Sequence, residues 1–420
     1  MKPKILTTLP VYTRALFAQD VMAGVTVAMV ALPLSLAIAI ASGADPAKGL
    51  VTAIVGGFLI SLLGGSRVQI GGPTGAFIVV VFGVIHQHGY DGLVIATLMA
   101  GLILLVAGIF RAGNLIRLVP EPVINGFTIG IAIIIATSQL KDIFGLQMAS
   151  VPAEFIAKIQ AMWDARASVS GASAVIGLVT MILIVAFRRA APKLPGLIVA
   201  VAITSAIVAF ANLPVDTIDT RFGDLPNTLP LPSLPAISFE RLIELLPSAL
   251  IIAFLAGIES LLSAMVADRM IAGHHRPNAE LLAQGAANIG SALFGGMPAT
   301  GAIARTATNI RAGGKTPVAG LIHALTILVI MAVAAPLVGY LAMPALAGLL
   351  ILTAWNMSEP HKLIAYLKEP RSDQFLLVLT LVLTVLADLT VAIGVGVALG
   401  LALRMYHRDV PPPDWSDPER

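Results

Sequence analysis

The sequence predicts an all-α membrane protein with fourteen transmembrane segments. Hydrophobic residues make up 57% of the 420 residues, and Asp, Glu, Lys and Arg together make up 12%, against roughly 25% charged residues in a soluble domain. Apolar runs that could cross a hydrocarbon core of about 30 Å recur from Val21 to Met405. The 38 Gly and 27 Pro indicate broken helices, which membrane proteins tolerate where the helices line a cavity.

The elements follow the apolar runs in order. We expect segments at about 21–42, 50–64, 72–88, 91–110, 119–140, 171–188, 195–212, 245–266, 279–295, 300–312, 317–339, 342–356, 373–388 and 390–406. An even number places both termini on one side of the membrane. With cytoplasmic termini, nineteen Lys and Arg lie on the inner side and six on the outer side, as the positive-inside rule requires.

Composition also excludes several classes of protein. The absence of Cys excludes thiol chemistry, disulfides and cysteine metal sites. The first apolar run continues to Ala41 without a cleavage site, so it is expected to be a retained helix. The net charge of +3 comes from basic residues scattered between apolar runs, so we expect no nucleic-acid partner. No H-E-x-x-H, G-x-S-x-G or Walker loop is present, so neither an intramembrane protease nor an ATP-driven pump is expected.

The third and tenth segments are short and begin at glycine and proline. The first break reads Gly71-Gly72-Pro73-Thr74-Gly75-Ala76, and the second reads Gly295-Gly296-Met297-Pro298-Ala299-Thr300-Gly301-Ala302. They occupy equivalent places if the chain consists of two units of seven segments, and an odd number of segments inverts the second unit. Paired breaks of this kind indicate the binding site of a transporter.

Both breaks predict half-helices whose first amides lie near the middle of the membrane. Free N–H groups and the positive end of the helix dipole attract an anion. We therefore predict a small-anion site made mostly of backbone. It is formed by Thr74, Gly75, Ala76, Gly301, Ala302 and Ile303. The alternative is that each Gly-Pro pair only marks a tight turn.

Glu259 lies well inside the eighth segment, with Ser263 one helical turn further along. An ionisable group at this depth is costly and is by default a functional hypothesis. Either it binds a proton, because burial favours the neutral carboxyl, or it holds a cation with nearby oxygens. We predict a role in ion coupling; the alternative is a neutral carboxyl bonded to the neighbouring backbone.

Arg305 lies about one turn past the start of the tenth segment. A guanidinium stays charged, so it needs a carboxylate, an anion or water. Two interpretations remain open: Arg305 attracts the anion, or it pairs with Glu259 to fix the tenth segment.

Several motifs in order resemble the SulP family of anion transporters. They are residues 31–39 (ALPLSLAIA), 72–75 (GPTG), 259–263 (ESLLS), 266–268 (VAD), 284–285 (QG) with Asn288, and 301–309 (GAIARTATN). The likeness covers about residues 20–408. Residues 141–148 and 354–359 are most similar to the bacterial branch that contains a proton-coupled C4-dicarboxylate transporter.

The resemblance implies an inverted repeat of seven plus seven segments in a multi-pass protein of the bacterial inner membrane. It implies a core domain of segments 1–4 and 8–11 (about 20–112 and 245–340) and a gate domain of segments 5–7 and 12–14 (about 117–212 and 342–406). It also implies elevator-like movement of the core, a homodimer, and a substrate site to which Ser35 and Ala37 contribute. Residues 1–19 would be the cytoplasmic N-terminus and residues 409–420 a short cytoplasmic tail, with the STAS domain of most relatives absent.

These expectations give a secondary active symporter, not an enzyme, that needs no cofactor. It would carry sulfate, bicarbonate or a C4-dicarboxylate with protons, although sodium stays possible. Glu259 and Ser263 match the cation site of a sodium-coupled bicarbonate member, which carries Asp and Thr there. The alternatives are sodium-coupled bicarbonate symport, an anion exchanger or channel, and a nucleobase:cation symporter of the same fold, which would want a second carboxylate where Arg305 stands.

Overall fold

The computed structural model describes residues 2–114, 120–148, 150–191, 195–360, 363–366, 368–387 and 389–406. Five of the nineteen Lys and Arg counted on the inner side, and the predicted tail 409–420, lie outside these residues: Arg117, Lys193, Lys362, Arg408 and Arg420.

Helices cover every apolar segment that the sequence predicts. Seven helical stretches within the described residues are long and apolar enough to cross a membrane. The helices over the predicted segments are α2 (Arg14–Ala41), α3 (Pro46–Val51), α4 (Gly57–Leu63), α5 (Ile78–Ile109), α6 (Glu121–Ile143), α8 (Gly171–Ala190), α9 (Gly196–Phe210), α11 (Phe239–Ile271), α12 (Pro277–Leu293), α13 (Ile303–Arg311), α14 (Val318–Gly339), α15 (Met343–Met357), α17 (Arg371–Leu386) and α18 (Leu389–Tyr406).

Short helices lie between these segments. They are α1 (Lys4–Thr8), α7 (Phe155–Asp164), α10 (Ile218–Phe222) and α16 (Leu363–Tyr366). The predicted loop 213–238 contains α10, whose Thr217 forms a capping box with Thr220. Side chains also cap long helices: Thr13 accepts a hydrogen bond from the amide of Leu16, and Ser238 accepts one from the amide of Arg241.

Two segments depart from regular α-helix. Between α3 and α4 the chain forms one turn of π-helix, η2 (Thr52–Gly56), a feature that often accompanies functional sites. Helix α5 consists of two helices, the third and fourth segments, which meet at the non-helical residue Gly89 (φ 69°, ψ 179°), so the predicted boundary near residue 90 corresponds to this break.

The two Gly/Pro breaks pair with each other. Strand β1 (Gly71–Gly72) lies antiparallel to β2 (Thr300–Gly301), with Gly71 opposite Gly301 and Gly72 opposite Thr300. Directly after β1 comes the 3₁₀ helix η3 (Gly75–Phe77), and after β2 comes α13. The sequence prediction that the third and tenth segments meet at their breaks is therefore confirmed.

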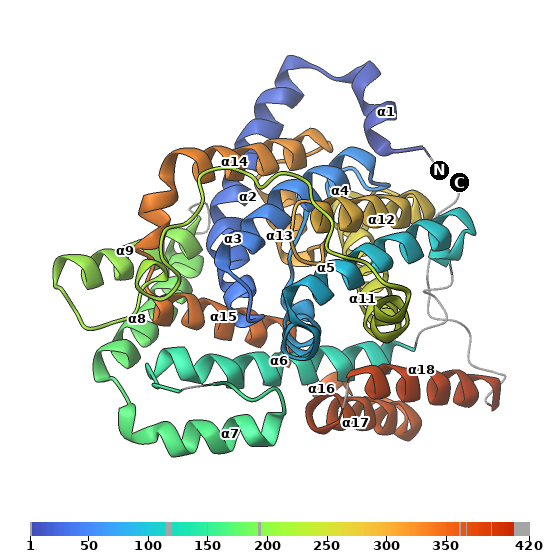
Figure 1. Cartoon of the computed structure of the whole chain (residues 1–420). Helices are drawn as coiled ribbons and strands as arrows, with labels where there is room; N and C mark the ends of the chain where they lie inside the picture. Colours follow the sequence, from blue (N-terminus) through green and yellow to red (C-terminus); the bar gives the residue numbers. More distant parts are fainter. Residues whose placement is uncertain are drawn as a thin grey trace.

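The helices pack in two groups. Helices α2, α3, α4, α5, α11, α12, α13 and α14 contact one another, and α6, α8, α9, α15, α17 and α18 contact one another. In Figure 1 the second group includes the lower layer, where α6, α17 and α18 run side by side. Fewer contacts join the groups, chiefly from α2 to α9 and α15.

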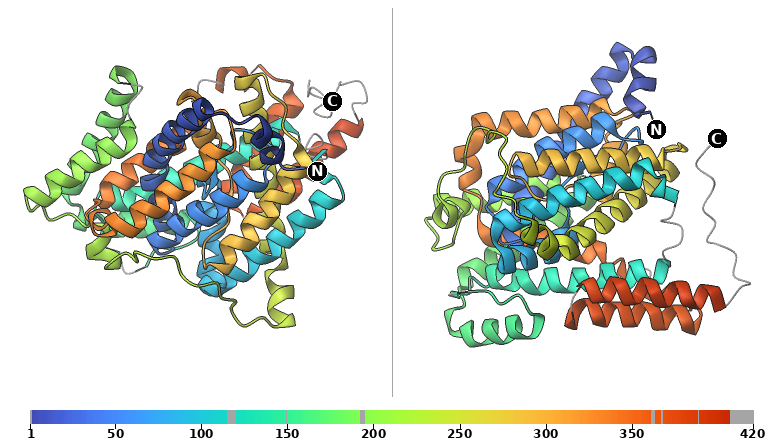
Figure 2. Two further views of the ribbon diagram at one scale, coloured as in Figure 1. Left: turned by 90° about the horizontal axis from the view of Figure 1, so that it is seen from above. Right: turned by 45° about the vertical axis from the view of Figure 1, so that its right-hand side comes forward.

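Contacts fix which elements share a face of the molecule with the N-terminus. The amide of Lys4 donates to the carbonyl of Gly64 (2.9 Å), and the amide of Lys315 donates to Asp20 near the start of α2 (3.0 Å). Helix α7 lies at the lower left of Figure 1, away from the N-terminus at the upper right, and the two views of Figure 2 show the same fold from other sides. Lys158 of α7 and Gly43, which follows α2, both lie beside Phe82, so α7 and the end of α2 share the opposite face. The C-terminal end of α13, next to Lys315, therefore lies on the N-terminal face.

Candidate functional site

The paired breaks place two helix starts beside one another within the first group of helices. Among the described residues, the amides of Gly75 and Ala76 at the start of η3 and of Ile303 and Ala304 at the start of α13 have no hydrogen-bond acceptor. Free amides at two helix starts are groups that can donate hydrogen bonds to an anion.

The amide of Ala302 differs from the prediction. It donates to the carbonyl of Ile70 (2.8 Å), because the strand pairing continues one residue past Gly301. In this conformation it has no free N–H for an anion, and Ile303 and Ala304 take its place. Gly301 itself is buried, and a Cβ there would lie 1.9 Å from Nε2 of Gln69, so its contribution is to allow close approach.

Thr74 and Glu259 are in direct contact. The Thr74 hydroxyl donates to the Glu259 carboxyl (2.6 Å), which joins the third segment to the eighth. Thr74 directly precedes η3. The Glu259 carboxyl therefore contacts the residue next to Gly75, whose amide is free. Ser263 is buried and donates to the hydroxyl of Thr306 (3.3 Å); its contact is with α13 and not with Glu259.

Arg305 is only 1% exposed and joins three segments. Its Nη2 donates to the Ser35 hydroxyl (3.1 Å) and to the carbonyl of Pro73 (3.0 Å). Nε and Nη1 have no hydrogen-bond partner among the described residues. The ion pair with Glu259 that the sequence suggested is not formed within 4.0 Å in the described part of the chain, because Arg305 points toward Ser35 and Pro73.

The remaining predicted residues, Ser35 and Ala37, are enclosed. Ser35 is fully buried, and its hydroxyl donates to the carbonyl of Ala31 (2.7 Å). The same hydroxyl oxygen accepts the hydrogen bond from Arg305. Ala37 is 1% exposed. The second group of helices closes over the start of η3, since a Cβ on Gly75 would lie 3.0 Å from Met357 and 3.5 Å from Ile135.

A buried polar cluster that sequence reasoning missed lies directly behind the strand pair. The Glu280 carboxyl accepts hydrogen bonds from the amides of Gly65 (2.8 Å) and Ser66 (3.2 Å) and from Gln69, Ser260 and Gln284 (2.9, 3.1 and 3.0 Å). Gln69 lies 211 residues from Glu280, so no local pattern could have joined them. The position of Glu280 and Gln284 four residues apart on one helix was the available signal.

His323 is a second residue that sequence reasoning missed. It is fully buried on α14, and neither ring nitrogen has a hydrogen-bond partner among the described residues. Its ring lies 3.7 Å from the position that a Cβ on Gly57 would take, next to the π-helical turn. Only an isolated histidine in an apolar run marked it in the sequence.

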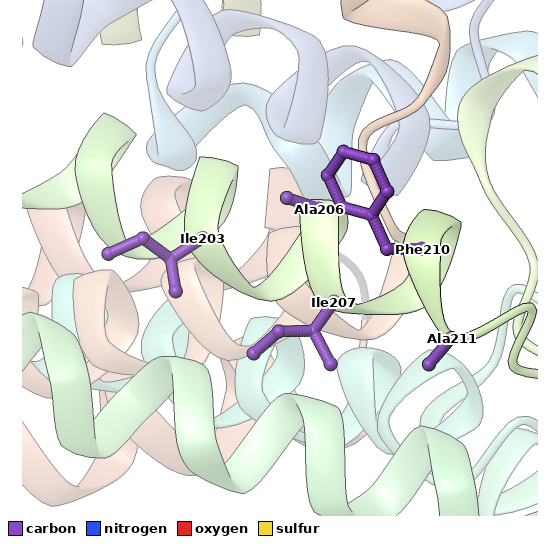
Figure 3. A pocket seen from close by; sticks show the side chains of 5 residues that line it. All are labelled: Ile203, Ala206, Ile207, Phe210 and Ala211. Atoms are coloured by element: carbon purple, nitrogen blue, oxygen red, sulfur yellow. The ribbon is translucent and has the colours of Figure 1, made fainter.

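A separate hollow on α9 does not suit an anion. It is lined by Ile203, Ala206, Ile207, Phe210 and Ala211 (Figure 3). Five apolar side chains offer no hydrogen-bond donor, so this surface is distinct from the site at the strand pair.

Comparison with known proteins agrees with the geometry. Residues 17–380 match the model of the sulfate permease family. The chain is 41% identical over 379 residues to "Putative sulfate transporter YvdB" of Bacillus subtilis, which covers 90% of this chain and 71% of that protein. It is 33% identical over 344 residues to the bicarbonate transporter BicA of Picosynechococcus, covering 79% of this chain and 60% of BicA.

A solved structure gives the same result. The transmembrane domain of a cyanobacterium bicarbonate transporter BicA matches with a TM-score of 0.82 and 31% identity, over 91% of this chain and 98% of that domain. The chain thus spans the whole of that transmembrane domain and about 60% of the full-length bicarbonate transporter. This protein is a multi-pass membrane protein that belongs to the sulfate permease (SulP) family of anion transporters.

Proposed function

We propose that the chain is a secondary active symporter that carries a small anion, namely sulfate, bicarbonate or a C4-dicarboxylate, together with a proton. The observation that carries the proposal is the buried guanidinium of Arg305, whose Nε and Nη1 have no partner, beside free amides of two helix starts. A buried cation without a counter-charge is costly. An anion at the strand pair would supply that charge.

Glu259 is suited to couple the anion to a proton. Its carboxyl and the guanidinium of Arg305 interact electrostatically although they form no ion pair. A charged Glu259 offsets part of the positive charge of Arg305 and repels an anion at the amides of η3. A proton on Glu259 removes both effects, so binding of the proton and of the anion favour each other.

The two helix groups support an elevator-like mechanism. The proposed core consists of segments 1–4 and 8–11, which contain the site, and the proposed gate consists of segments 5–7 and 12–14. Met357 and Ile135 from the gate abut Gly75, so movement of the core past the gate would uncover the site. The same proposal includes fourteen segments in an inverted repeat, cytoplasmic termini, the bacterial inner membrane and a homodimer.

The test is uptake of radiolabelled sulfate, bicarbonate and succinate into proteoliposomes, at two external pH values, with and without sodium. We expect uptake of at least one anion against its gradient, faster at acidic external pH and independent of sodium. Sodium-dependent bicarbonate uptake would instead identify the coupling ion as sodium. Anion conductance without concentrative uptake would identify a channel.

Substitution of the coupling residue gives the first prediction. Glu259→Gln keeps the size of the side chain and its acceptor for Thr74 but cannot change its charge. We expect loss of concentrative uptake driven by a proton gradient, with anion exchange down a gradient retained. Ser263→Ala tests the second predicted coupling residue, whose hydroxyl contacts Thr306 and not Glu259. Undiminished proton-driven uptake by Glu259→Gln would remove Glu259 from the coupling mechanism.

A further inference from the structure

Lys158 on α7 is a buried cation without a counter-ion. The residue is 4% exposed, and its ammonium nitrogen, which keeps some solvent contact, has no hydrogen-bond acceptor or carboxylate partner among the described residues. The ammonium lies over the ring of Phe82, 5.1 Å from its centroid. Burial lowers the pKa of Lys158. Such a group is costly unless an anion or a polarisable surface accompanies it.

Arg221 and Arg166 on the same face have ordinary surroundings, and Lys48 lies over the Tyr90 ring (5.0 Å) much as Lys158 lies over Phe82. Arg221 donates to Asp142 (2.6 Å) and to Asp216 (2.9 Å). Burial of its guanidinium is outweighed by these two carboxylates, which raise the pKa of Arg221. Arg166 is exposed, lies 4.9 Å from the Trp163 ring and donates to the carbonyl of Trp163 (2.7 Å). Lys158 therefore differs from these neighbours in being both enclosed and unpaired.

The contact between Lys158 and Phe82 joins the two groups of helices. Helix α7 packs on α6 and α17, which belong to the proposed gate, and Phe82 is on α5, which packs on α11 and α12 of the proposed core. Phe82 also lies beside Gly43, just past the end of α2. This places the contact at the face opposite the N-terminus.

Along the third segment, the contact lies between the strand pair and that face. Phe82 follows Gly75 by seven residues, or about 10 Å along a helix. In the other direction from the site, α13 exposes Ile303 (40%), Ala304 and Arg311 on one side. The predicted site is thus bordered by exposed residues toward the N-terminal face and by Lys158 and Phe82 toward the opposite face.

We propose that Lys158 is an entry site for the transported anion on the face opposite the N-terminus. The proposal rests on the proposed function, since it takes the ligand to be the same small anion. The Lys158 ammonium group stays in contact with the Phe82 ring while this face is closed. When the core moves and carries Phe82 away, the ammonium loses that surface, and an incoming anion is the counter-charge that it then takes up.

The experiment measures uptake kinetics in right-side-out and inside-out membrane vesicles with radiolabelled sulfate, bicarbonate and succinate. For Lys158→Gln we expect about a tenfold higher KM from the face opposite the N-terminus, a weaker dependence of that KM on ionic strength, and an unchanged KM from the N-terminal face. Lys158→Arg should restore the KM. Arg166→Gln is the matched control, because it removes an exposed cation eight residues away, and its KM should stay within twofold of wild type.

Thermal stability separates a ligand role from a structural one. Lys158→Met keeps the apolar stem and removes the buried charge, so we expect a higher melting temperature together with the higher KM. A cation that only fastens α7 to Phe82 would give a lower melting temperature.

Three results would overturn the proposal: a KM for Lys158→Gln within twofold of wild type, an equal shift for Arg166→Gln, or a lower melting temperature for Lys158→Met with an unchanged KM. If wild type takes up none of the three anions, the proposed function fails and this inference fails with it. If wild type transports and Lys158→Gln matches it, only the inference about Lys158 fails.

Discussion

Arg305 shows how one side chain can hold segments together and still leave donors for the proposed anion. Its Nη2 holds Ser35 of α2 and the carbonyl of Pro73, so it fixes the first segment and both breaks relative to each other. Its other two nitrogens have no partner in the part of the chain that the structure describes. The two interpretations left open by the sequence are therefore compatible, although the structural partner is Ser35 and not Glu259.

Substitutions can separate these two roles. Arg305→Ala removes the charge, and we expect at least a tenfold loss of anion affinity and a weaker dependence of that affinity on salt, measured by equilibrium binding of labelled anion. Arg305→Lys keeps the charge but loses the planar fork, so it should retain the salt dependence with intermediate affinity. Ser35→Ala removes one acceptor and leaves the charge. An equal loss for Ser35→Ala and Arg305→Ala would show that only the structural role matters.

The positions of the site residues could be predicted from sequence only where the signal is local. Gly72, Pro73 and Gly301 interrupt apolar runs, and this is visible without a partner. The partner of each polar group is not visible, because it lies far away in the chain: Thr74 contacts Glu259, 185 residues away, and Arg305 contacts Ser35, 270 residues away. Lys158 was missed because α7 lies between apolar runs, where a lysine is expected to be solvated.

Among the elements, the pair β1–β2 depends on residues without side chains. A Cβ on Gly301 would meet Nε2 and Cδ of Gln69 at 1.9 and 2.6 Å, and one on Gly71 would meet Ile60 at 2.3 Å. Gln69 cannot easily move aside, because it donates to both Ser260 and Glu280. The Glu280 cluster thus holds Gln69 in place, and the glycines allow the two breaks to pack closely against it.

Gly301→Ala tests this dependence. Overpacking of a dense interior costs about 1–3 kcal/mol, so we expect a lower melting temperature and a loss of anion uptake of tenfold or more. Gly83→Ala is the matched control, since it lies in the same segment as η3 and a Cβ there meets nothing within 4 Å. Wild-type uptake and stability in Gly301→Ala would contradict the close packing described for β2.

For the molecule as a whole, the helical fold was accessible from sequence because most apolar runs are long, with a length set by the bilayer. The division into two groups of helices was not, since it depends on which apolar faces meet. Helices such as α2 and α14 are apolar over most of their surface, so periodicity does not say which side is buried. That division came from the family resemblance and not from the pattern of residues.

The exposed side of α13 and the enclosed position of Lys158 together predict from which face of the membrane the site is accessible. The chain has no cysteine, so single cysteines can be introduced directly. Ala304→Cys, on the exposed side of α13, should react with a membrane-impermeant maleimide from the N-terminal face, and bound anion should slow the reaction. Arg166→Cys should react from the opposite face, and Ala28→Cys, which is fully buried, should not react from either.

Labelling rates from the two faces also distinguish an elevator-like transporter from a channel. If the core moves relative to the gate, Phe82→Cys should become reactive from the face opposite the N-terminus under conditions that slow labelling of Ala304→Cys, because one movement opens one side as it closes the other. An anion channel would need both positions to be reactive at the same time. Labelling of both cysteines at undiminished rates under all conditions would therefore exclude alternating access, whereas an inverse relation between the two rates would be the signature of an elevator-like movement.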